Sequence, residues 1–582
     1  MSKMGDILKK LKSVDVLFLC FLCGLASLIF IKAFYLNSFI SAYTNSDVNV
    51  YKKVLLNDGL IYFLFTLFLY VSFLRVTPPI ISYTLKTVAF LLVSFYAFDL
   101  IVFSTFHTRL ITTDIFQYGK NFQYVFNLHY EFILFLPALF VFLIALRAQI
   151  SSLVVHGISM ALIFLFAGCC LLKDNGDYVH SWVYENYIAY NLSVASQRRP
   201  YIEMQRADLD ELFPQTCVKT EARDKPNVIM LMVESLSLYH SALFSGIHNW
   251  TPRFDGIAEQ NIMLGNMVSN GYNTEDAEVA LLTGEFPIPA PQARNPDGNA
   301  DFAGFYNHRY ALPVLFQEEG YRSEFITSAS LSFSSTGEWA ESLGFDYIEG
   351  SEHIYYKDWP RFAFSAAADE ALYTRALSRI KENAKQKFFL FVKTASTHHP
   401  FTDPVSGVPS EEKTVKYADK QIGAFYDHLI KSGFFENGLL IITGDHRTMT
   451  ALNRNEIEAF GVRRAAARVP AIISYGGRRQ SVYTELSQHT DIYNGLKNLI
   501  SDRVCFSALA GDPFVSTPIF PKYVLHKQGG RRGEISVFSG QKNAAIKLDG
   551  DQTRYVTEPH FHEAQKLITY ISSKRISRAE DQ

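Results

Sequence analysis

The sequence predicts two structural parts: a five-helix transmembrane domain at the N-terminus, and an α/β domain with a mostly parallel central sheet. Three observations predict them. The chain has five long apolar stretches, a sharp rise in charge after them, and then short apolar runs alternating with helix-like segments. Of the 112 charged residues in the 582-residue chain, only 21 lie in the first 175 residues. The average composition therefore combines a lipid-compatible part with a soluble one.

The net charge of the two parts differs in sign and excludes one class of function. The first 175 residues have a net charge of +5, and the rest of the chain has a net charge of -7. A mildly acidic soluble part lacks the basic surface that nucleic-acid binding requires, so we expect no nucleic-acid partner. Hydrophobic residues make up 48% of the chain, which also excludes extensive disorder.

Each apolar stretch, with a residue or two of flank, approaches the roughly 20 residues that cross a bilayer as a helix. The stretches cover residues 16–31, 59–74, 87–103, 132–146 and 154–172. Four lysines precede the first stretch, but no clean cleavage site follows it, so we expect a retained helix. The predicted parts are a transmembrane domain (1–175), juxtamembrane linker helices (176–222), an α/β domain (223–502) and a C-terminal strand and helix extension (503–582).

The distribution of Lys and Arg predicts the side of the membrane on which the soluble part lies. The N-terminus is basic, and the loops after the second and fourth stretches carry Arg75, Lys86 and Arg147. This places the N-terminus in the cytoplasm, although basic residues in the other loops make the asymmetry moderate. Five spans then place the soluble domain outside the cytoplasm. Cys217 and Cys505 either pair in that oxidising compartment or are two unrelated buried thiols.

The soluble part alternates strand-like and helix-like segments, which is typical of a parallel sheet covered on both faces. The strand-like runs are residues 227–233, 322–327, 387–393, 438–443 and 469–475, and helix-like segments such as 309–319, 364–383 and 416–431 lie between them. Ligands of such sheets bind at the carboxyl ends of the strands. We therefore looked for chemically active residues at these ends.

Carboxylates and histidines follow three of the predicted strands. Glu234 follows the first strand, His398 follows the third after a short threonine-rich turn, and Asp445 and His446 follow the fourth. Glu234 alone could cap a helix, and a single histidine is more often structural than catalytic. Three such strand ends together predict a metal site, since carboxylate and imidazole groups bind Zn²⁺ and Mn²⁺.

A fourth ligand is expected from the segment 269–278, which reads as a loop that enters a short helix. Asn273 or Thr274 is placed at the N-cap of this helix and Gly284 beyond its end. A hydroxyl group in contact with a metal loses its proton more readily and becomes a nucleophile. The residue types alone favour the simpler interpretation, in which Thr274 only caps the helix.

The ordered motifs of this chain resemble those of the lipoteichoic acid synthase type of phosphoglycerol transferase, in the alkaline phosphatase and sulfatase superfamily. The motifs are VES (233–235), GYNTEDAE (271–278), THHPF (397–401) and GDH (444–446). The resemblance extends to about residue 500 and includes the five N-terminal spans. It implies an alkaline phosphatase or sulfatase-like fold for the catalytic domain.

The resemblance also implies a role for each matching residue. Glu234, Thr274, Asp445 and His446 would bind one divalent ion, Mn²⁺ in first place and Zn²⁺ or Mg²⁺ as alternatives. Thr274 would be the nucleophile that takes a headgroup phosphate from a phospholipid. His398 would contact the substrate and assist proton transfer.

Three further positions bear on the resemblance. Trp339 matches a tryptophan that contacts the headgroup in this family. Glu341 stands where family members carry an arginine, and this departure leaves the headgroup open. His489 lies in a segment similar to a turn near the end of these domains, where it would have a structural or supporting role.

The resemblance implies a phospholipid donor, phosphatidylglycerol or phosphatidylethanolamine, and a cell-envelope glycan or polymer as acceptor. A true sulfatase is excluded because no Cys or Ser followed by x-Pro-x-Arg occurs near Thr274. A phosphoethanolamine transferase stays open, although those enzymes typically carry several disulfides in the soluble domain. A membrane scaffold with an inactive site is the third alternative. The extension at 503–582 either contacts the acceptor or completes the domain.

Overall fold

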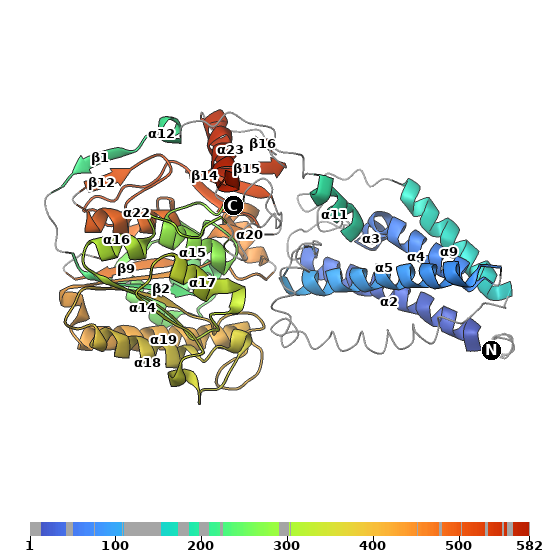
Figure 1. Cartoon of the computed structure of the whole chain (residues 1–582), viewed down its shortest axis with the longest axis horizontal. Coiled ribbons are helices and arrows are strands. Elements are labelled where there is room, and N and C mark those ends of the chain that lie inside the picture. The colour runs from blue at the N-terminus through green and yellow to red at the C-terminus, as the bar shows by residue number, and fades with distance from the viewer. Residues whose placement is uncertain are drawn as a thin grey trace. The chain divides into compact units, whose positions relative to one another are not determined.

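The computed structural model divides the chain into two compact units, residues 1–196 and 197–582 (Figure 1). Within them the structure describes residues 13–41, 50–74, 76–106, 109, 153–172, 186–196, 209–220, 225–289, 302, 304–450, 452–476, 480–501, 503–529, 533–549, 552–555 and 563–580. The boundary between the units falls inside the linker predicted at 176–222. The two units are described separately.

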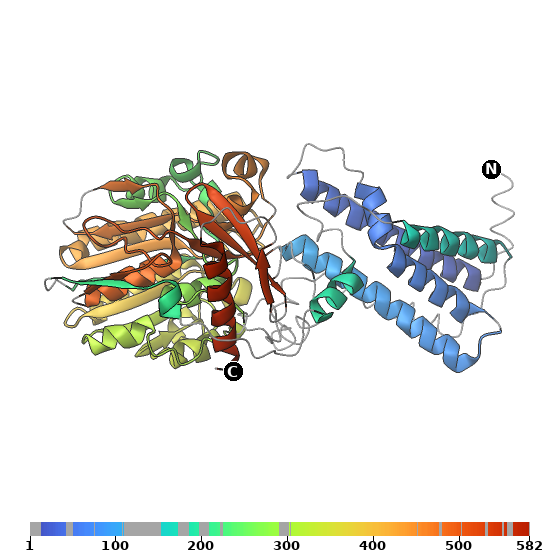
Figure 2. The ribbon, with the colours of Figure 1, turned by 90° about the horizontal axis from the view of Figure 1, so that it is seen from above.

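The first unit is a bundle of apolar helices (Figure 2). Its described helices are α2 (Ser13–Ser41), α3 (Val50–Asn57), α4 (Gly59–Phe73), α5 (Pro79–Phe106), α9 (Leu153–Leu171) and α11 (Tyr187–Ser196). Four stretches are long and apolar enough to cross a membrane: Phe18–Asn37, Lys52–Phe73, Pro79–Phe103 and Leu153–Leu171. They correspond to four of the five predicted spans. The remaining prediction, at 132–146, lies outside the described residues.

The second unit is built on an eight-stranded sheet with the strand order β10-β3-β9-β8-β2-β7-β5-β6. The strands are β2 (Asn227–Val233), β3 (Ile262–Leu264), β5 (Arg322–Thr327), β6 (Tyr347–Glu349), β7 (Phe388–Lys393), β8 (Gly438–Gly444), β9 (Ala471–Tyr475) and β10 (Ser481–Tyr483). Only β9 runs antiparallel to both of its neighbours, β3 and β8, and the other described pairs in this sheet are parallel. The predicted mostly parallel sheet is confirmed, and all five predicted strands belong to it.

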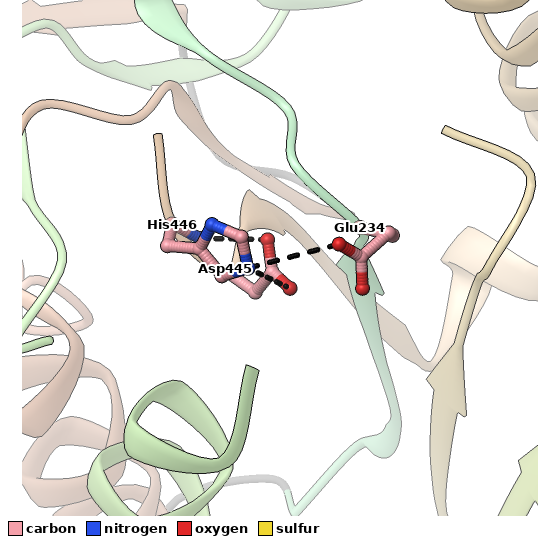
Figure 3. A group of neighbouring side chains, drawn as sticks. All are labelled: Glu234, Asp445 and His446. Atoms are coloured by element: carbon pink, nitrogen blue, oxygen red, sulfur yellow. Dashed lines mark hydrogen bonds and ion pairs between the residues drawn. The ribbon is translucent and has the colours of Figure 1, made fainter. Parts of the chain in front are cut away.

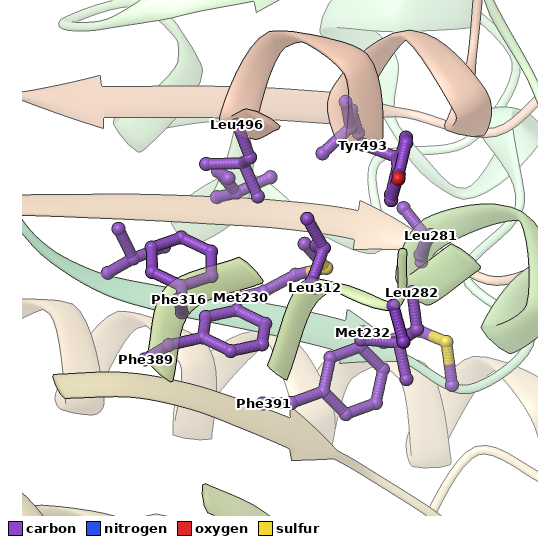
Figure 4. Packing of buried hydrophobic residues seen from close by; sticks show 14 of the residues in the cluster. Met230, Met232, Leu281, Leu282, Leu312, Phe316, Phe389, Phe391, Tyr493 and Leu496 are labelled. Carbon is purple, nitrogen blue, oxygen red and sulfur yellow. The ribbon is translucent and has the colours of Figure 1, made fainter. Parts of the chain in front are cut away.

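Helices cover both faces of this sheet, which explains why its central strands are apolar throughout. Along β2, Met230 and Met232 face one apolar core, whereas Ile229 and Leu231 face the other. The first core is closed by α15 (Thr274–Thr283), α16 (Leu312–Glu318), α17 (Thr336–Ser342) and α22 (His489–Ile500) (Figure 4). The second core is closed by α14 (Pro252–Ala258), α18 (Asp369–Glu382) and α19 (Glu411–Lys431).

The C-terminal extension forms a smaller antiparallel sheet with its own core. Its elements are β13 (Val524–Lys527), β14 (Glu534–Ser539), β15 (Lys542–Asp549), β16 (Gln552–Tyr555) and α23 (Ala564–Glu580). Leu525, Val537 and Ile546 meet Leu567 and Ile571 of α23 in that core. The predicted combination of strands and a helix is confirmed.

A disulfide joins the beginning of the second unit to a distant part of it. Cys217 in β1 (Thr216–Lys219) is bonded to Cys505 in β12 (Arg503–Phe506), 288 residues later in the chain. The two strands pair antiparallel, with the two cysteines as register partners. The pairing of these two cysteines, which was one of two interpretations, is confirmed.

Candidate metal centre and nucleophile

The candidate metal centre lies at the carboxyl ends of two neighbouring parallel strands. Glu234 directly follows β2, and Asp445 and His446 directly follow β8. The last residues of these strands, Val233 and Gly444, are register partners. The strand pairing alone therefore brings side chains 211 positions apart in the chain to the same place, as expected for a sheet of this type.

The three side chains converge on one buried point (Figure 3). One ligand atom from each of Glu234, Asp445 and His446 lies within 4.8 Å of the others. Nε2 of His446 is 3.7 Å from Oε1 of Glu234 and 3.4 Å from Oδ2 of Asp445. In the described part of the chain, this is the one group of three or more His, Cys, Asp or Glu residues whose ligand atoms lie close enough together to hold a metal ion.

Backbone groups fix the orientation of these carboxylates. Oδ1 of Asp445 accepts hydrogen bonds from the N–H groups of Ser235 (2.7 Å) and His446 (2.6 Å). The Ser235 hydroxyl donates to Oε1 of Glu234 at 2.8 Å. Oδ2 of Asp445 has no hydrogen-bond partner in the described part of the chain, although it is fully buried. A buried carboxylate oxygen without a donor is costly, and a cation would supply the missing partner.

The pKa values of the two carboxyl groups also favour a bound cation. Burial, together with the nearby carboxylate of Glu234, holds the pKa of Asp445 well above its usual value. Burial alone would also raise the pKa of Glu234, but His398 and His446 bring it below the usual value. Two adjacent buried carboxylates resist carrying two negative charges unless a cation lies between them. The donor set of two carboxylates and one imidazole therefore fits a divalent metal ion.

Thr274 contributes a hydroxyl group to the same place. Its Oγ1 donates to Oε2 of Glu234 at 3.1 Å and lies 3.4 Å from Nε2 of His446. The N-cap of α15 is Asn273, whose side chain accepts from the N–H of Asp276, and Thr274 is the first residue of the helix. Because Asn273 is the cap, the hydroxyl of Thr274 faces the candidate metal centre. The interpretation of Thr274 as a mere N-cap is wrong.

His398 lies in the turn after β7, on the other side of Glu234 from β8. Its Nδ1 is 2.6 Å from the carbonyl oxygen of His399, and its ring packs edge-on against Phe364 at 4.4 Å. The imidazole of His398 helps to lower the pKa of the Glu234 carboxyl. The role of His398 in proton transfer stays a prediction.

Trp339 is completely covered in this structure. Its indole N–H donates to the carbonyl oxygen of Phe305 at 3.0 Å, and its ring stacks on Phe302 at 4.0 Å. Glu341, two residues later on α17, is exposed. The headgroup contact of Trp339 stays a prediction.

His489, the first residue of α22, supports the strand end that carries Asp445. Its Nε2 is 3.0 Å from the carbonyl oxygen of Gly444, the residue directly before Asp445. Burial lowers the pKa of His489 to about 3, so the ring is neutral and donates to this carbonyl. This contact supports the end of β8, and a supporting role was one of the two roles expected for His489.

Sequence reasoning missed several side chains that hold the site. Thr394 Oγ1 accepts from the N–H of Glu234 at 3.0 Å, and the Thr397 hydroxyl donates to the carbonyl oxygen of Glu234. Both follow β7, so the strand-end rule that identified His398 could have included them. Lys393, the last residue of β7, pairs with Glu278 of α15 at 3.0 Å. The sequence carried no signal for that pair, because it depends on how α15 packs on the sheet.

Comparison with known proteins agrees with this geometry. The Sulfatase family model matches residues 226–500, which contain Glu234, Thr274, Asp445 and His446. This region is therefore homologous to the sulfatases. The resemblance inferred from the motifs is confirmed at that level.

Among characterised proteins, the chain is distantly homologous to phosphoglycerol transferase I. The Salmonella typhi protein is 24% identical over 253 residues, which are 40% of this chain and 32% of the relative. The Escherichia coli protein is 26% identical over 254 residues, with the same shares. The chain thus spans about a third of the length of these curated relatives.

Solved structures with a similar fold include lipoteichoic acid synthase LtaP from Listeria monocytogenes. It has a TM-score of 0.47 and 18% sequence identity, and the match covers 64% of this chain and 96% of that one. A protein of the alkaline phosphatase superfamily from Vibrio parahaemolyticus has a TM-score of 0.48 and 18% identity, with shares of 67% and 94%.

Proposed function

We propose that this chain is a membrane-anchored phosphotransferase that moves a phospholipid headgroup to a cell-envelope glycan or polymer. The donor is phosphatidylglycerol and the group moved is phosphoglycerol. The observation that carries the proposal is the position of the Thr274 hydroxyl, 3.1 Å from Glu234 in a buried group of two carboxylates and a histidine. That arrangement gives a threonine nucleophile beside a cation site.

The proposed reaction consists of two displacements at phosphorus. In the first, Oγ1 of Thr274 loses its proton and bonds to the headgroup phosphorus, and the bond to diacylglycerol breaks as that oxygen takes up a proton. In the second, an acceptor hydroxyl loses its proton and bonds to phosphorus, the bond between phosphorus and Oγ1 of Thr274 breaks, and Oγ1 takes up a proton. Covalent capture lets diacylglycerol leave before the acceptor arrives.

Residues of this chain would perform three tasks in these steps. Glu234, Asp445, His446 and Thr274 would hold one divalent ion, which is Mn²⁺ in the proposal. When bound, such an ion lowers the pKa of the threonine hydroxyl and offsets the charge on the phosphate oxygens. Glu234 accepts the hydrogen bond from Thr274 in the resting site. His398, beside Glu234, would exchange a proton with the departing or attacking oxygen.

The membrane helices support a lipid as the donor. Four described helices have the length and apolar character to cross a bilayer, so the chain is anchored where its donor lies. The distant homology to phosphoglycerol transferase I favours phosphoglycerol as the group moved. The Cys217–Cys505 disulfide supports an extracytoplasmic catalytic domain, because such bonds persist in oxidising compartments.

Phosphoethanolamine transfer is the second candidate, and one residue favours it. Glu341 is an exposed carboxylate where the resembling family carries an arginine, and a carboxylate suits the ammonium group of ethanolamine. The soluble unit has one disulfide among its described residues, which favours phosphoglycerol over this alternative.

The experiment that tests the proposal is the intact mass of the purified, detergent-solubilised chain after incubation with Mn²⁺ and one lipid. A phosphoglycerol adduct with phosphatidylglycerol, mapped to Thr274 and missing in Thr274→Ala, is the expected result. A phosphoethanolamine adduct with phosphatidylethanolamine would replace the first candidate with the second. An unmodified chain with both lipids would overturn both and favour the scaffold.

A further inference from the structure

The loop that leads to Thr274 is attached to the C-terminal sheet rather than only to the domain that carries the metal centre. The main-chain N–H of Lys527 donates to the carbonyl oxygen of Asn270 at 2.9 Å. The Asn270 side chain donates to the carbonyl oxygen of Leu525 at 2.8 Å, and Nδ1 of His526 is 2.8 Å from the carbonyl oxygen of Ser269. Three consecutive residues of β13 thus bind the loop just before the nucleophile.

One buried ion pair continues this attachment into helix α15. Nζ of Lys527 lies 2.9 Å from Oδ1 of Asp276, with side chains that are 4% and 0% exposed. Oδ2 of Asp276 accepts from the N–H of Tyr272 at 3.3 Å, and the N–H of Asp276 donates to the Asn273 cap at 2.9 Å. Asp276 therefore connects the residues on both sides of Thr274 to Lys527.

The space around the loop leaves no room for another arrangement. A Cβ atom on Gly271 would lie 2.2 Å from Oδ2 of Asp276. A Cβ atom on Gly529, two residues after Lys527, would lie 2.4 Å from the ring of Tyr272. The ammonium group of Lys527 also lies 5.5 Å from the centre of that ring. Gly529 is thus required by the close approach of the C-terminal sheet to the loop, and Gly271 by the close approach of the loop to Asp276.

We propose that Lys527 is a positioning residue for the nucleophile: by pairing with Asp276 it holds the 269–273 loop and the first turn of α15 so that the Thr274 hydroxyl faces Glu234. Neither residue reaches the metal centre in the described contacts, so Lys527 acts through Asp276. A misplacement of a reacting group by about 1 Å costs on the order of 100-fold in rate. Through Lys527, strand β13 would therefore position the nucleophile without touching the reacting groups. This inference rests on the proposed function, because it assigns the nucleophile to Thr274.

The test compares Lys527→Met, Asp276→Asn and the double variant in the full-length, detergent-solubilised chain. Lys522→Met is the matched control, since Lys522 is half-exposed and pairs with Glu563 in the same extension. The measurements are the rate of adduct formation on Thr274 at saturating phosphatidylglycerol, the lipid KM, the melting temperature, and hydrogen exchange of the 269–274 amides.

We expect Lys527→Met to slow adduct formation about 10- to 100-fold at saturating lipid with an unchanged KM, and to speed exchange of the loop amides. The double variant loses no more than the more affected single variant, because both remove one interaction. A lower melting temperature with a wild-type rate would mean a purely structural role and would overturn the inference.

Two further outcomes are also decisive. If Lys527→Met does not fold, the double variant takes its place, because the double variant leaves no unpaired buried charge. A wild-type rate of adduct formation in the double variant overturns the inference. If the wild-type chain itself forms no adduct, the proposed function fails, and the exchange data alone decide whether Lys527 holds the loop. Equal exchange in the wild type and the variant then overturns the positioning role.

Discussion

The hydroxyl of Thr274 donates a hydrogen bond to Oε2 of Glu234 at 3.1 Å, although the two residues lie 40 positions apart in the chain. Glu234 comes from the end of a central strand and Thr274 from the first turn of a helix that covers the sheet. Their contact exists because Asn273 takes over the capping of that helix and frees the Thr274 hydroxyl. The proposed nucleophile and the candidate cation site are therefore one structural unit.

Replacing Thr274 by alanine should abolish headgroup transfer while the fold persists. We expect at least about a thousand-fold lower turnover of phosphatidylglycerol, because the Thr274 hydroxyl lies 3.1 Å from Glu234 and 3.4 Å from His446, whereas the Ser235 hydroxyl is described in contact with Glu234 alone among these two. Thr274→Ser keeps a hydroxyl and should retain measurable turnover. Release of diacylglycerol and the melting temperature are the measurements. Unchanged release in Thr274→Ala would contradict the mechanism.

Asp445 should be needed for metal binding and not for folding of the metal-free chain. We expect Asp445→Asn to weaken Mn²⁺ binding by more than about 100-fold, because one of the two buried carboxylates is lost. Without metal, the variant should be at least as stable as the wild type, since burial and Glu234 already raise the pKa of Asp445.

Titration calorimetry and melting curves with and without Mn²⁺ measure both effects. Bound metal raises the melting temperature of the wild type, since it stabilises only the folded chain. The exposed carboxylate Asp358 provides the control variant Asp358→Asn. A wild-type response of Asp445→Asn to Mn²⁺ would remove Asp445 from the metal site.

Asp369 should make the stability of the soluble unit depend on pH. Burial raises its pKa to about 6, whereas the unfolded chain has a value of about 3.9. Between about pH 4 and pH 6 the folded state binds more protons than the unfolded state. Asp369 therefore lowers the free energy of unfolding as pH rises through that window, by about 3 kcal/mol in total.

The variant Asp369→Asn isolates this effect because the asparagine fits the same contacts. Oδ1 of Asp369 accepts from the N–H groups of Ala395 and Ser396, and Oδ2 has no hydrogen-bond partner in the described part of the chain. The melting temperature of the variant relative to the wild type should rise from pH 4 to pH 7. A difference that stays constant with pH would contradict the raised pKa.

The Cys217–Cys505 disulfide should stabilise the soluble unit and report its compartment. Removing it with paired Cys→Ser substitutions should cost about 2–5 kcal/mol, since the bond closes a loop of 288 residues. Melting temperatures of the oxidised and substituted chains test this. Acid-quenched alkylation of intact cells should leave both cysteines unlabelled. Labelling of both would contradict an extracytoplasmic location.

The periodicity of the chain was sufficient to predict the central sheet and the ligands at its edge. Residues 227–233 and 438–443 are continuous apolar runs that end in Glu234 and Gly444-Asp445, and strands buried on both faces must have this character. The position of the candidate metal ligands followed from the rule that parallel strands present their carboxyl ends together. Four of the five membrane spans followed equally directly from length and apolarity.

The role of Thr274 and the contribution of the C-terminal extension were not predictable from local pattern. Asn273 and Thr274 are both good helix caps, and only the packed helix shows which one caps it. The stacking of Trp339 on Phe302 and its hydrogen bond to the carbonyl oxygen of Phe305 were not predictable in this way either. Such contacts join segments that are distant in the sequence, and the periodicity of the sequence, which is a local pattern, does not predict them.

The sequence by itself therefore determined the division into a membrane part and a soluble part, the strands of the sheet, and the donor groups Glu234, Asp445 and His446. These depend on hydrophobic pattern and on residue type at a strand end, which are local properties. Only the tertiary structure decided that the Thr274 hydroxyl faces Glu234 and that Lys527, 251 residues after Asp276, holds the loop in place. A buried ion pair between remote segments forms only when both are already packed, because packing removes the water that would otherwise solvate each charge.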